Sequence, residues 1–230
     1  MQASPLFIID RHRPRQLTKE MLQYYEQRRP EYEAIYSKPE RQNDLDWLEQ
    51  QICSFVPGRR VLEIASGTGY WTRRISKTAS FVLATDASEQ LAAIAVESCP
   101  THNVQSQDMD AFSIPKDLNF DCLIAGFFFS HVLLNQQRQF LNGIAQSMKP
   151  GSKLILFDNR FVEGSSTPIS RVTEAGDTYQ QQRLSDGSCF EVLKNFPRSE
   201  NLTSLFHQFC RNVSVKESQY FWLASGNLVA

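Results

Sequence analysis

Residues 61–71 read VLEIASGTGYW, in which an apolar, strand-like run leads into a turn and then into a helical pattern. Gly67 and Gly69 stand one residue apart in the turn, and this arrangement after a buried strand is typical of a backbone loop that cradles a nucleotide. Two positions depart from a dinucleotide loop, because Thr72 stands where its third glycine is expected and Ala65 where many such loops carry another glycine. The stretch predicts a nucleotide loop and leaves open which nucleotide it holds.

From residue 59 onward, apolar runs alternate with helical patterns. Strands with few polar residues, separated by helices, indicate a parallel sheet that is covered by helices on both faces. A last run, 213–225, alternates as an antiparallel strand with one wetted face does. The earlier expected strands are 59–65, 80–88, 103–108, 120–129 and 151–159, and the expected helices are 68–79, 88–99, 136–148 and 202–210.

Two segments lie outside this alternation. Residues 1–57 have helical patterns, with Pro30 suited to the first turn of a helix, and we expect them to form an N-terminal helical cap. Residues 58–230 would then form the core, interrupted at about 160–197 by an insertion rich in Ser, Gly, Thr and charged residues. We expect this insertion to be a loop or a hairpin around Asp186-Gly187.

Composition excludes several classes of protein. The 230 residues include 24 basic and 25 acidic side chains, for a net charge of -1, which argues against a dedicated nucleic-acid-binding protein. The five cysteines form no CxxC pair and the four histidines no HExxH motif, so we expect no metal site and reduced thiols. The first residues lack the pattern of a secretory signal, and no apolar run approaches the ~20 residues of a membrane span. We therefore expect a cytoplasmic protein that does not enter membranes.

The residues at the expected strand ends indicate the kind of ligand, because a doubly wound sheet binds ligands across the carboxyl ends of its strands. Asp86 ends the second strand, where an acid can accept hydrogen bonds from both hydroxyls of a ribose. Glu63 would repel a pyrophosphate and suit a cation. Tyr70 and Trp71 would crowd the approach that a nicotinamide dinucleotide needs. A nucleoside with a positive centre and no phosphate, such as S-adenosylmethionine, suits these residues better.

Five stretches carry a more specific signal through their order and spacing. They are VLEIASGTG (61–69), VLATD (82–86), SQDMDAF (106–112), FDCLIAGFFFSHV (120–132) and KPGSKLILFD (149–158). In combination they resemble the class I S-adenosylmethionine-dependent methyltransferase family over roughly residues 58–159. The resemblance implies a Rossmann-like, doubly wound, mostly parallel seven-stranded sheet with an antiparallel last strand. It also implies S-adenosylmethionine as the cofactor, S-adenosylhomocysteine as its product, and no metal.

The resemblance assigns roles to individual residues. Glu63 would help to organise the ammonium group of the cofactor, Asp86 would hold the ribose, and Asp108 would bond the adenine amino group. Each of the residues assigned in this way could instead have a purely structural role in a turn, a helix cap, a loop or the core. The residues expected to bind the cofactor are Glu63, Ala65, Gly67, Gly69, Asp86, Ala87, Asp108, Met109, Phe127, Tyr25 and Tyr32.

The sequence indicates the residues that would bind the methyl acceptor less clearly. His131 follows the fourth strand, and its ordinary pKa near ~6.5 would suit a general base, although a structural, hydrogen-bonded histidine is equally open. Tyr25 and Tyr32 share a helical face that either lines the site or packs on the core, and Arg28 beside them is expected to be a solvated surface residue. Within the insertion, residues considered for the acceptor wall are Arg171, Tyr179, Arg183 and Lys194.

Together these features predict a methyltransferase that acts on nitrogen or oxygen of a small, planar organic molecule. Sixteen phenylalanines, three of them consecutive at 127–129, favour an apolar pocket for such an acceptor. A tRNA or other RNA methyltransferase and a nicotinamide-dependent oxidoreductase are the alternatives. No nucleic-acid partner is expected, and the oligomeric state is left open.

Overall fold

The computed structural model of the chain describes residues 19–229, so residues 1–18 of the expected cap lie outside the described part. The described cap begins with helix α1 (Lys19–Arg28) and ends with helix α2 (Gln42–Cys53). Between them, η1 (Arg29–Ser37) and η2 (Pro39–Arg41) are 3₁₀ helices, each with a proline among its first two residues. The helix expected after Pro30 is therefore present but wound more tightly.

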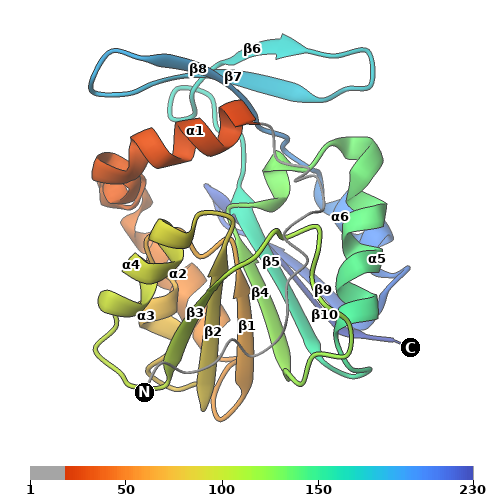
Figure 1. Cartoon of the computed structure of the whole chain (residues 1–230). Coiled ribbons are helices and arrows are strands. Elements are labelled where there is room, and N and C mark those ends of the chain that lie inside the picture. The colour runs from red at the N-terminus through yellow and green to blue at the C-terminus, as the bar shows by residue number, and fades with distance from the viewer. Residues whose placement is uncertain (1–18, 230) are drawn as a thin grey trace.

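The core is a seven-stranded sheet in the order β3-β2-β1-β4-β5-β10-β9 (Figure 1). Strands β1 to β5 are parallel, and β10 runs antiparallel to both β5 and β9. This arrangement confirms the predicted doubly wound, mostly parallel sheet with an antiparallel last strand. The strands are β1 (Arg60–Ile64), β2 (Phe81–Asp86), β3 (Val104–Asp108), β4 (Cys122–Gly126), β5 (Lys153–Asn159), β9 (Cys210–Glu217) and β10 (Phe221–Leu228).

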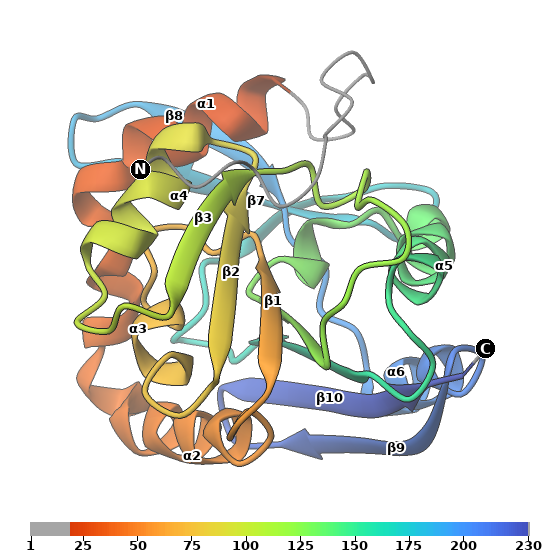
Figure 2. The ribbon, with the colours of Figure 1, turned by 60° about the horizontal axis from the view of Figure 1, so that its bottom comes forward.

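Alternating side chains of the strands build two cores. Leu62, Leu83 and Leu123 pack with the buried faces of α5 (Gln137–Ser147) and α6 (Ser199–Phe206). The intervening residues, such as Val61 and Val82, pack with α2, α3 (Thr72–Ile75) and α4 (Glu89–Glu97). Figure 2 shows these two groups of helices on opposite faces of the sheet.

The structure corrects two of the predicted elements. The run 213–225 is not one strand, because the backbone N–H of Ser218 donates to the carbonyl of Phe221 at 2.9 Å and closes a turn between β9 and β10. The helix expected over 68–79 is reduced to α3, since Gly69 has a φ of 84° and keeps the preceding residues in a turn. Within residues 19–229, no helix combines the length and apolar character needed to cross a bilayer.

The insertion forms a sheet of its own. Strands β7 (Thr178–Arg183) and β8 (Cys189–Leu193) make the hairpin expected around Asp186-Gly187, and β6 (Ile169–Val172) adds a third strand that was not predicted. In Figure 1 this sheet lies at the top, beyond one end of the main sheet, with α1 directly beneath it. Tyr24 of α1 packs with Val192 of β8. The cap and the insertion thus meet above the same edge of the core.

Two glycines provide a matched test of the loop geometry. Gly69 and Gly187 have φ values of 84° and 89°, so alanine at either position adopts a strained backbone. At Gly69 an added Cβ would lie 2.6 Å from Cα of Ala95, whereas nothing lies within 4 Å of it at Gly187. We expect Gly187→Ala to lower the free energy of unfolding by about 1 kcal/mol.

Gly69→Ala should lower it by about 1–3 kcal/mol more, because the loop and α4 must separate. Urea unfolding of the two variants measures the difference. Equal losses would show that Gly69 is required only for its backbone conformation.

Candidate active site

Two adjoining cavities open at the carboxyl ends of the parallel strands, beneath α1 and the three-stranded sheet. The larger has a volume of about 230 Å³ and the smaller about 50 Å³. Ligands of doubly wound sheets bind at this edge. The residues that line both cavities are Tyr25, Tyr32, Ala65, Gly126, Phe127 and His131.

The glycine loop, residues 65–69 after β1, is held by Asp86 at the end of β2. The backbone N–H of Gly67 donates to Oδ2 of Asp86 at 3.0 Å, and the N–H of Ser88 donates to Oδ1 at 2.9 Å. Ala65 has a φ of 54°, a conformation that glycine adopts at lower cost. Alanine at this position therefore keeps the glycine-type turn despite the strain, which accounts for the departure seen in the sequence.

Glu63 is the buried acid of the site. Its carboxylate accepts a hydrogen bond from the Thr72 hydroxyl at 2.6 Å, and the residue is 3% exposed. Burial raises the pKa of Glu63 to about 8, and the nearby Asp86 carboxylate adds to the increase. A cation placed beside Glu63 would reverse this cost, because it stabilises the charged carboxylate.

The smaller cavity contains part of the expected nucleoside site. Asp86, Ala87 and Met109 line it, and the backbone N–H of Met109 donates to the Asp86 carbonyl at 2.8 Å. Asp108 ends β3 next to these residues but is not among the described lining residues. Gly67 is covered by Tyr32, whose hydroxyl oxygen would lie 2.5 Å from a Cβ added there. Both expected tyrosines, Tyr25 and Tyr32, thus line the cavities.

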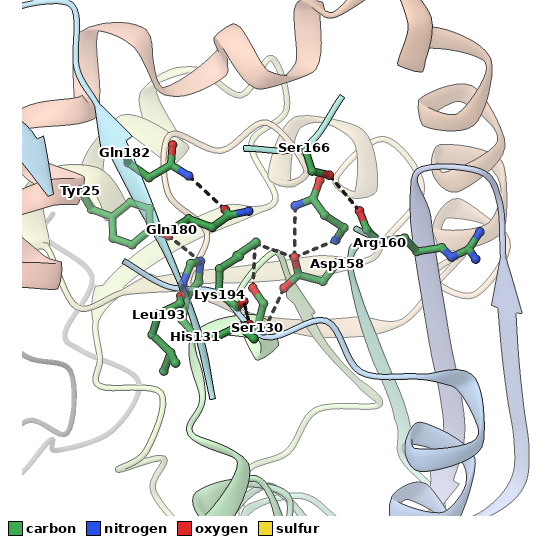
Figure 3. Close-up of polar contacts among 12 residues, drawn as sticks. Tyr25, Ser130, His131, Asp158, Arg160, Ser166, Gln180, Gln182, Leu193 and Lys194 are labelled. Atoms are coloured by element: carbon green, nitrogen blue, oxygen red, sulfur yellow. Dashed lines mark hydrogen bonds and ion pairs between the residues drawn. The ribbon is translucent and has the colours of Figure 1, made fainter. Parts of the chain in front are cut away.

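His131 and Tyr25 form a pair between the two cavities (Figure 3). Nδ1 of His131 lies 2.6 Å from the Leu193 carbonyl, which can only accept, so Nδ1 carries the proton. Nε2 lies 2.7 Å from the Tyr25 hydroxyl and must accept from it while the ring is neutral. Burial, reinforced by the charge of Lys194, lowers the pKa of His131 to about 3. His131 is therefore neutral, and the Tyr25 hydroxyl occupies its basic nitrogen.

A second buried pair, formed by Lys194 and Asp158, supports the same side of the larger cavity. Nζ of Lys194 lies 2.9 Å from Oδ1 of Asp158 and 2.7 Å from Oγ of Ser130, and the Ser130 N–H donates to the other carboxylate oxygen (Figure 3). Burial by itself raises the pKa of Asp158, but Lys194 and the hydrogen bonds outweigh it and hold the pKa below its usual range. This pair joins the insertion to the end of β5.

The structure places one further arginine of this region at the larger cavity and the others away from it. Arg28 is not a solvated surface residue, because it donates to the Tyr24 hydroxyl at 2.7 Å and lines the larger cavity. Arg160, which follows β5, pairs with Glu217 and is not among the described lining residues, and its side chain is directed away from Asp158 and Lys194 in Figure 3. Arg171 pairs with Glu191 on the exposed sheet and lies over the Tyr179 ring, and Arg183 is exposed.

Several lining residues were not singled out in the sequence. Among them, Lys38 precedes η2 and Arg41 ends it, and Gln180 and Gln182 come from β7. Charged residues near a helix start usually belong to a solvated face, so no local pattern marks the first two. Among residues 19–229, no three His, Cys, Asp or Glu side chains are grouped so that they could hold a metal ion.

Comparisons with known proteins identify the family. A family model described as a methyltransferase domain matches residues 61–151. An uncharacterized methyltransferase of Staphylococcus carnosus (strain TM300) is 31% identical over 147 residues, which span 62% of this chain and 69% of that protein.

Two solved structures are similar over nearly the whole chain. The DhpI-SAH complex has a TM-score of 0.74 at 27% identity and covers 92% of this chain and 96% of its own. The DhpI-SAM-HEP complex has a TM-score of 0.73 at 26% identity, with 90% and 95% covered. These matches favour S-adenosylmethionine over the nicotinamide alternative. With the strand order and the glycine loop described above, they establish that the chain belongs to the class I S-adenosylmethionine-dependent methyltransferase family.

Proposed function

We propose that the chain moves the methyl group of S-adenosylmethionine to nitrogen or oxygen of a small, planar organic acceptor bound in the larger cavity. The observation that carries this proposal is the junction of the two cavities at Tyr25, Phe127 and His131. The smaller cavity suits a nucleoside, and the larger one combines aromatic walls with a few polar groups, as small-molecule sites do. The DhpI-SAM-HEP complex supports the proposal, since it is a complex of a similar chain with SAM and a further component.

The residues of the chain fit the cofactor. Glu63 is a buried carboxyl group whose described hydrogen-bond partner is a hydroxyl, so an ammonium group beside it would favour its charged form. Asp86 would accept from the ribose hydroxyls while it keeps its two backbone bonds, because a carboxylate has about four acceptor sites. Met109 would pack against the adenine ring. Arg28, beside Tyr32 above the glycine loop, would face the carboxylate of the methionine half.

The transfer itself depends mainly on alignment. When bound, S-adenosylmethionine supplies an electrophilic methyl carbon, which a lone pair of the acceptor attacks in line with the departing thioether sulfur. Phe127 has a φ of 57° and lines both cavities, so this strained backbone holds an aromatic wall at the junction. The cap and the insertion exclude water from it.

Tyr25 and His131 would orient the acceptor. Because the Tyr25 proton is directed to Nε2 of His131, the oxygen of Tyr25 can accept a hydrogen bond from the N–H or O–H that is methylated. With its low pKa, His131 is a weak base, so its role is to hold Tyr25 as an acceptor rather than to remove the proton directly. The methylated N–H or O–H, which becomes cationic on transfer, loses its proton to solvent as the products leave.

A transfer assay tests the proposed function. Label from methyl-labelled S-adenosylmethionine should enter a small molecule when the enzyme is incubated with fractionated small-molecule cell extract, and mass spectrometry should identify the product. Asp86→Ala should lose most incorporation at limiting cofactor, whereas Asp46→Ala, which removes an exposed carboxylate, should not. Label that enters only tRNA or protein would contradict a small acceptor.

The pKa of Glu63 leads to a second prediction. At pH 7 the carboxyl of the free protein is largely protonated, because its pKa is about 8, and an ammonium group beside it favours the charged form. S-adenosylhomocysteine binding should therefore release close to one proton, which calorimetry in buffers of different ionisation enthalpy measures.

In Glu63→Gln this release should vanish and affinity should fall by about 10–100-fold, as for a lost charge-assisted hydrogen bond. Glu97→Gln, at an exposed position, is the control. Unchanged proton release in Glu63→Gln would place the titrating group elsewhere.

Tyr25→Phe isolates the proposed hydrogen bond to the acceptor. We expect kcat/KM for the acceptor to fall about 10–100-fold while affinity for S-adenosylhomocysteine changes less than about threefold. Tyr179→Phe, on the exposed sheet, should behave as the parent. Equal losses of cofactor and acceptor binding would mean that Tyr25 serves the cofactor.

Since His131 is neutral throughout, the pH profile of the parent enzyme should show no limb near 6.5 from this residue.

A further inference from the structure

Two cations of the larger cavity are outside the machinery described so far. Nζ of Lys38 lies 3.1 Å from the carbonyl oxygen of Ser165, and Nη2 of Arg41 lies 3.2 Å from the same oxygen. Arg41 also donates to the Ser165 hydroxyl at 2.9 Å and to Oδ1 of Asn159 at 3.3 Å. The two positive groups therefore converge on one neutral carbonyl at the cavity wall.

The charge of this pair is poorly balanced. Arg41 is 7% exposed, and its Nε is buried without a hydrogen-bond partner among the described residues. The nearest carboxylate that pairs with it, Glu40, lies 4.0 Å from Nε, and its side chain is 43% exposed to solvent. Burial and the neighbouring Arg41 lower the pKa of Lys38, as expected for two cations held together. An anion between them would remove this repulsion and supply the missing acceptor.

The position of the pair points to the acceptor rather than to the cofactor. Asn159 ends β5, which lies two strands from β1 and three from β2 in the sheet. The glycine loop and Asp86 follow β1 and β2. Glu63 and Ala65 enter the larger cavity from β1, whereas Asn159 enters it from β5. Lys38, Arg41, Asn159 and Ser165 line the larger cavity and are absent from the lining of the smaller one. Lys194 adds a third cation on this side, but Asp158 neutralises it.

From this placement we infer that Lys38 and Arg41 form an oxyanion subsite, and that the methyl acceptor carries a carboxylate or a phosphate-type group which binds there. The inference rests on the proposed function and specifies its substrate class. Arg41 would offer a planar guanidinium to two oxygens, and Lys38 a mobile point charge to a third. The acceptor would then be held by its anionic end while its other end reaches Tyr25.

A structural role for Arg41 makes different predictions. As a clamp alone, it would only tie η2 to the loop after β5, and its loss would reduce stability without selectivity for ligand charge. Lys38 is less buried and its ammonium group makes one described hydrogen bond, so Lys38→Met should fold even if Arg41→Gln does not. Arg171→Gln is the matched control, because it removes a cation of the insertion that lies outside the cavity.

Equilibrium dialysis of the enzyme loaded with S-adenosylhomocysteine tests the subsite directly. The probes are radiolabelled inorganic phosphate, acetate and acetamide, the last being a neutral analogue of acetate. At least one anion should bind the parent and Arg171→Gln in a one-to-one ratio, and at least tenfold more weakly to Lys38→Met and Arg41→Gln. Preference for phosphate would indicate a tetrahedral group and preference for acetate a carboxylate.

Acetamide binding as tight as acetate, or anion binding unchanged in Lys38→Met, would overturn the inference.

A second measurement separates the inference from the proposed function. Extract is divided on an anion exchanger, and each fraction is used in the labelled-methyl assay. Transfer only with the retained fraction, with an acceptor KM raised at least tenfold in Lys38→Met, supports the subsite. Transfer with the unretained fraction alone overturns the subsite and leaves the methyltransferase function standing. Anion binding without transfer to any fraction supports the subsite and contradicts the small-molecule function.

Discussion

The parallel direction of β1, β2, β4 and β5 is the constraint on which the site depends. Parallel strands bring all their carboxyl ends to one edge, where the chain must turn away and leaves side chains without ladder partners. Asp86, Phe127 and Asn159 reach the site for this reason, although they are far apart in the sequence. The cap and the insertion then cover part of this edge, so the end of the sheet becomes a pair of partly open cavities.

Burial determines the charge states at this edge. Glu63, with one hydroxyl partner, has a raised pKa, whereas Asp158, with Lys194 and Ser130, has a lowered one. The first carboxyl is left to be satisfied by a ligand, and the second is satisfied within the protein. A similar distinction separates Lys194, which contacts the buried Asp158 carboxylate, from Lys38 and Arg41, which share a neutral carbonyl while the half-exposed Glu40 lies 4.0 Å from Arg41. The proposed ligand contacts therefore lie where buried charge is poorly balanced within the protein, and the balanced Lys194–Asp158 pair joins the insertion to β5.

The hydrogen-bond partners of His131 change the role that its place in the sequence suggested. From the sequence it is a candidate base, and its position beside the cavities agrees with that hypothesis. The hydrogen bonds to Leu193 and Tyr25 define its tautomer and occupy its lone pair. In the proposed function, the group that would reach the acceptor is then the oxygen of Tyr25, which comes from α1.

The fold class and the S-adenosylmethionine family could be predicted from the amino-acid sequence. Local apolar periodicity and the spacing of Gly67, Gly69 and Asp86 depend on neighbouring residues, so they can be recognised without the fold. The pairing of Lys194 with Asp158 and the convergence of Lys38 and Arg41 on Ser165 could not be predicted in this way. Those contacts join segments more than a hundred residues apart or cross between sheets, and the burial that sets their charge states exists only once the chain has folded.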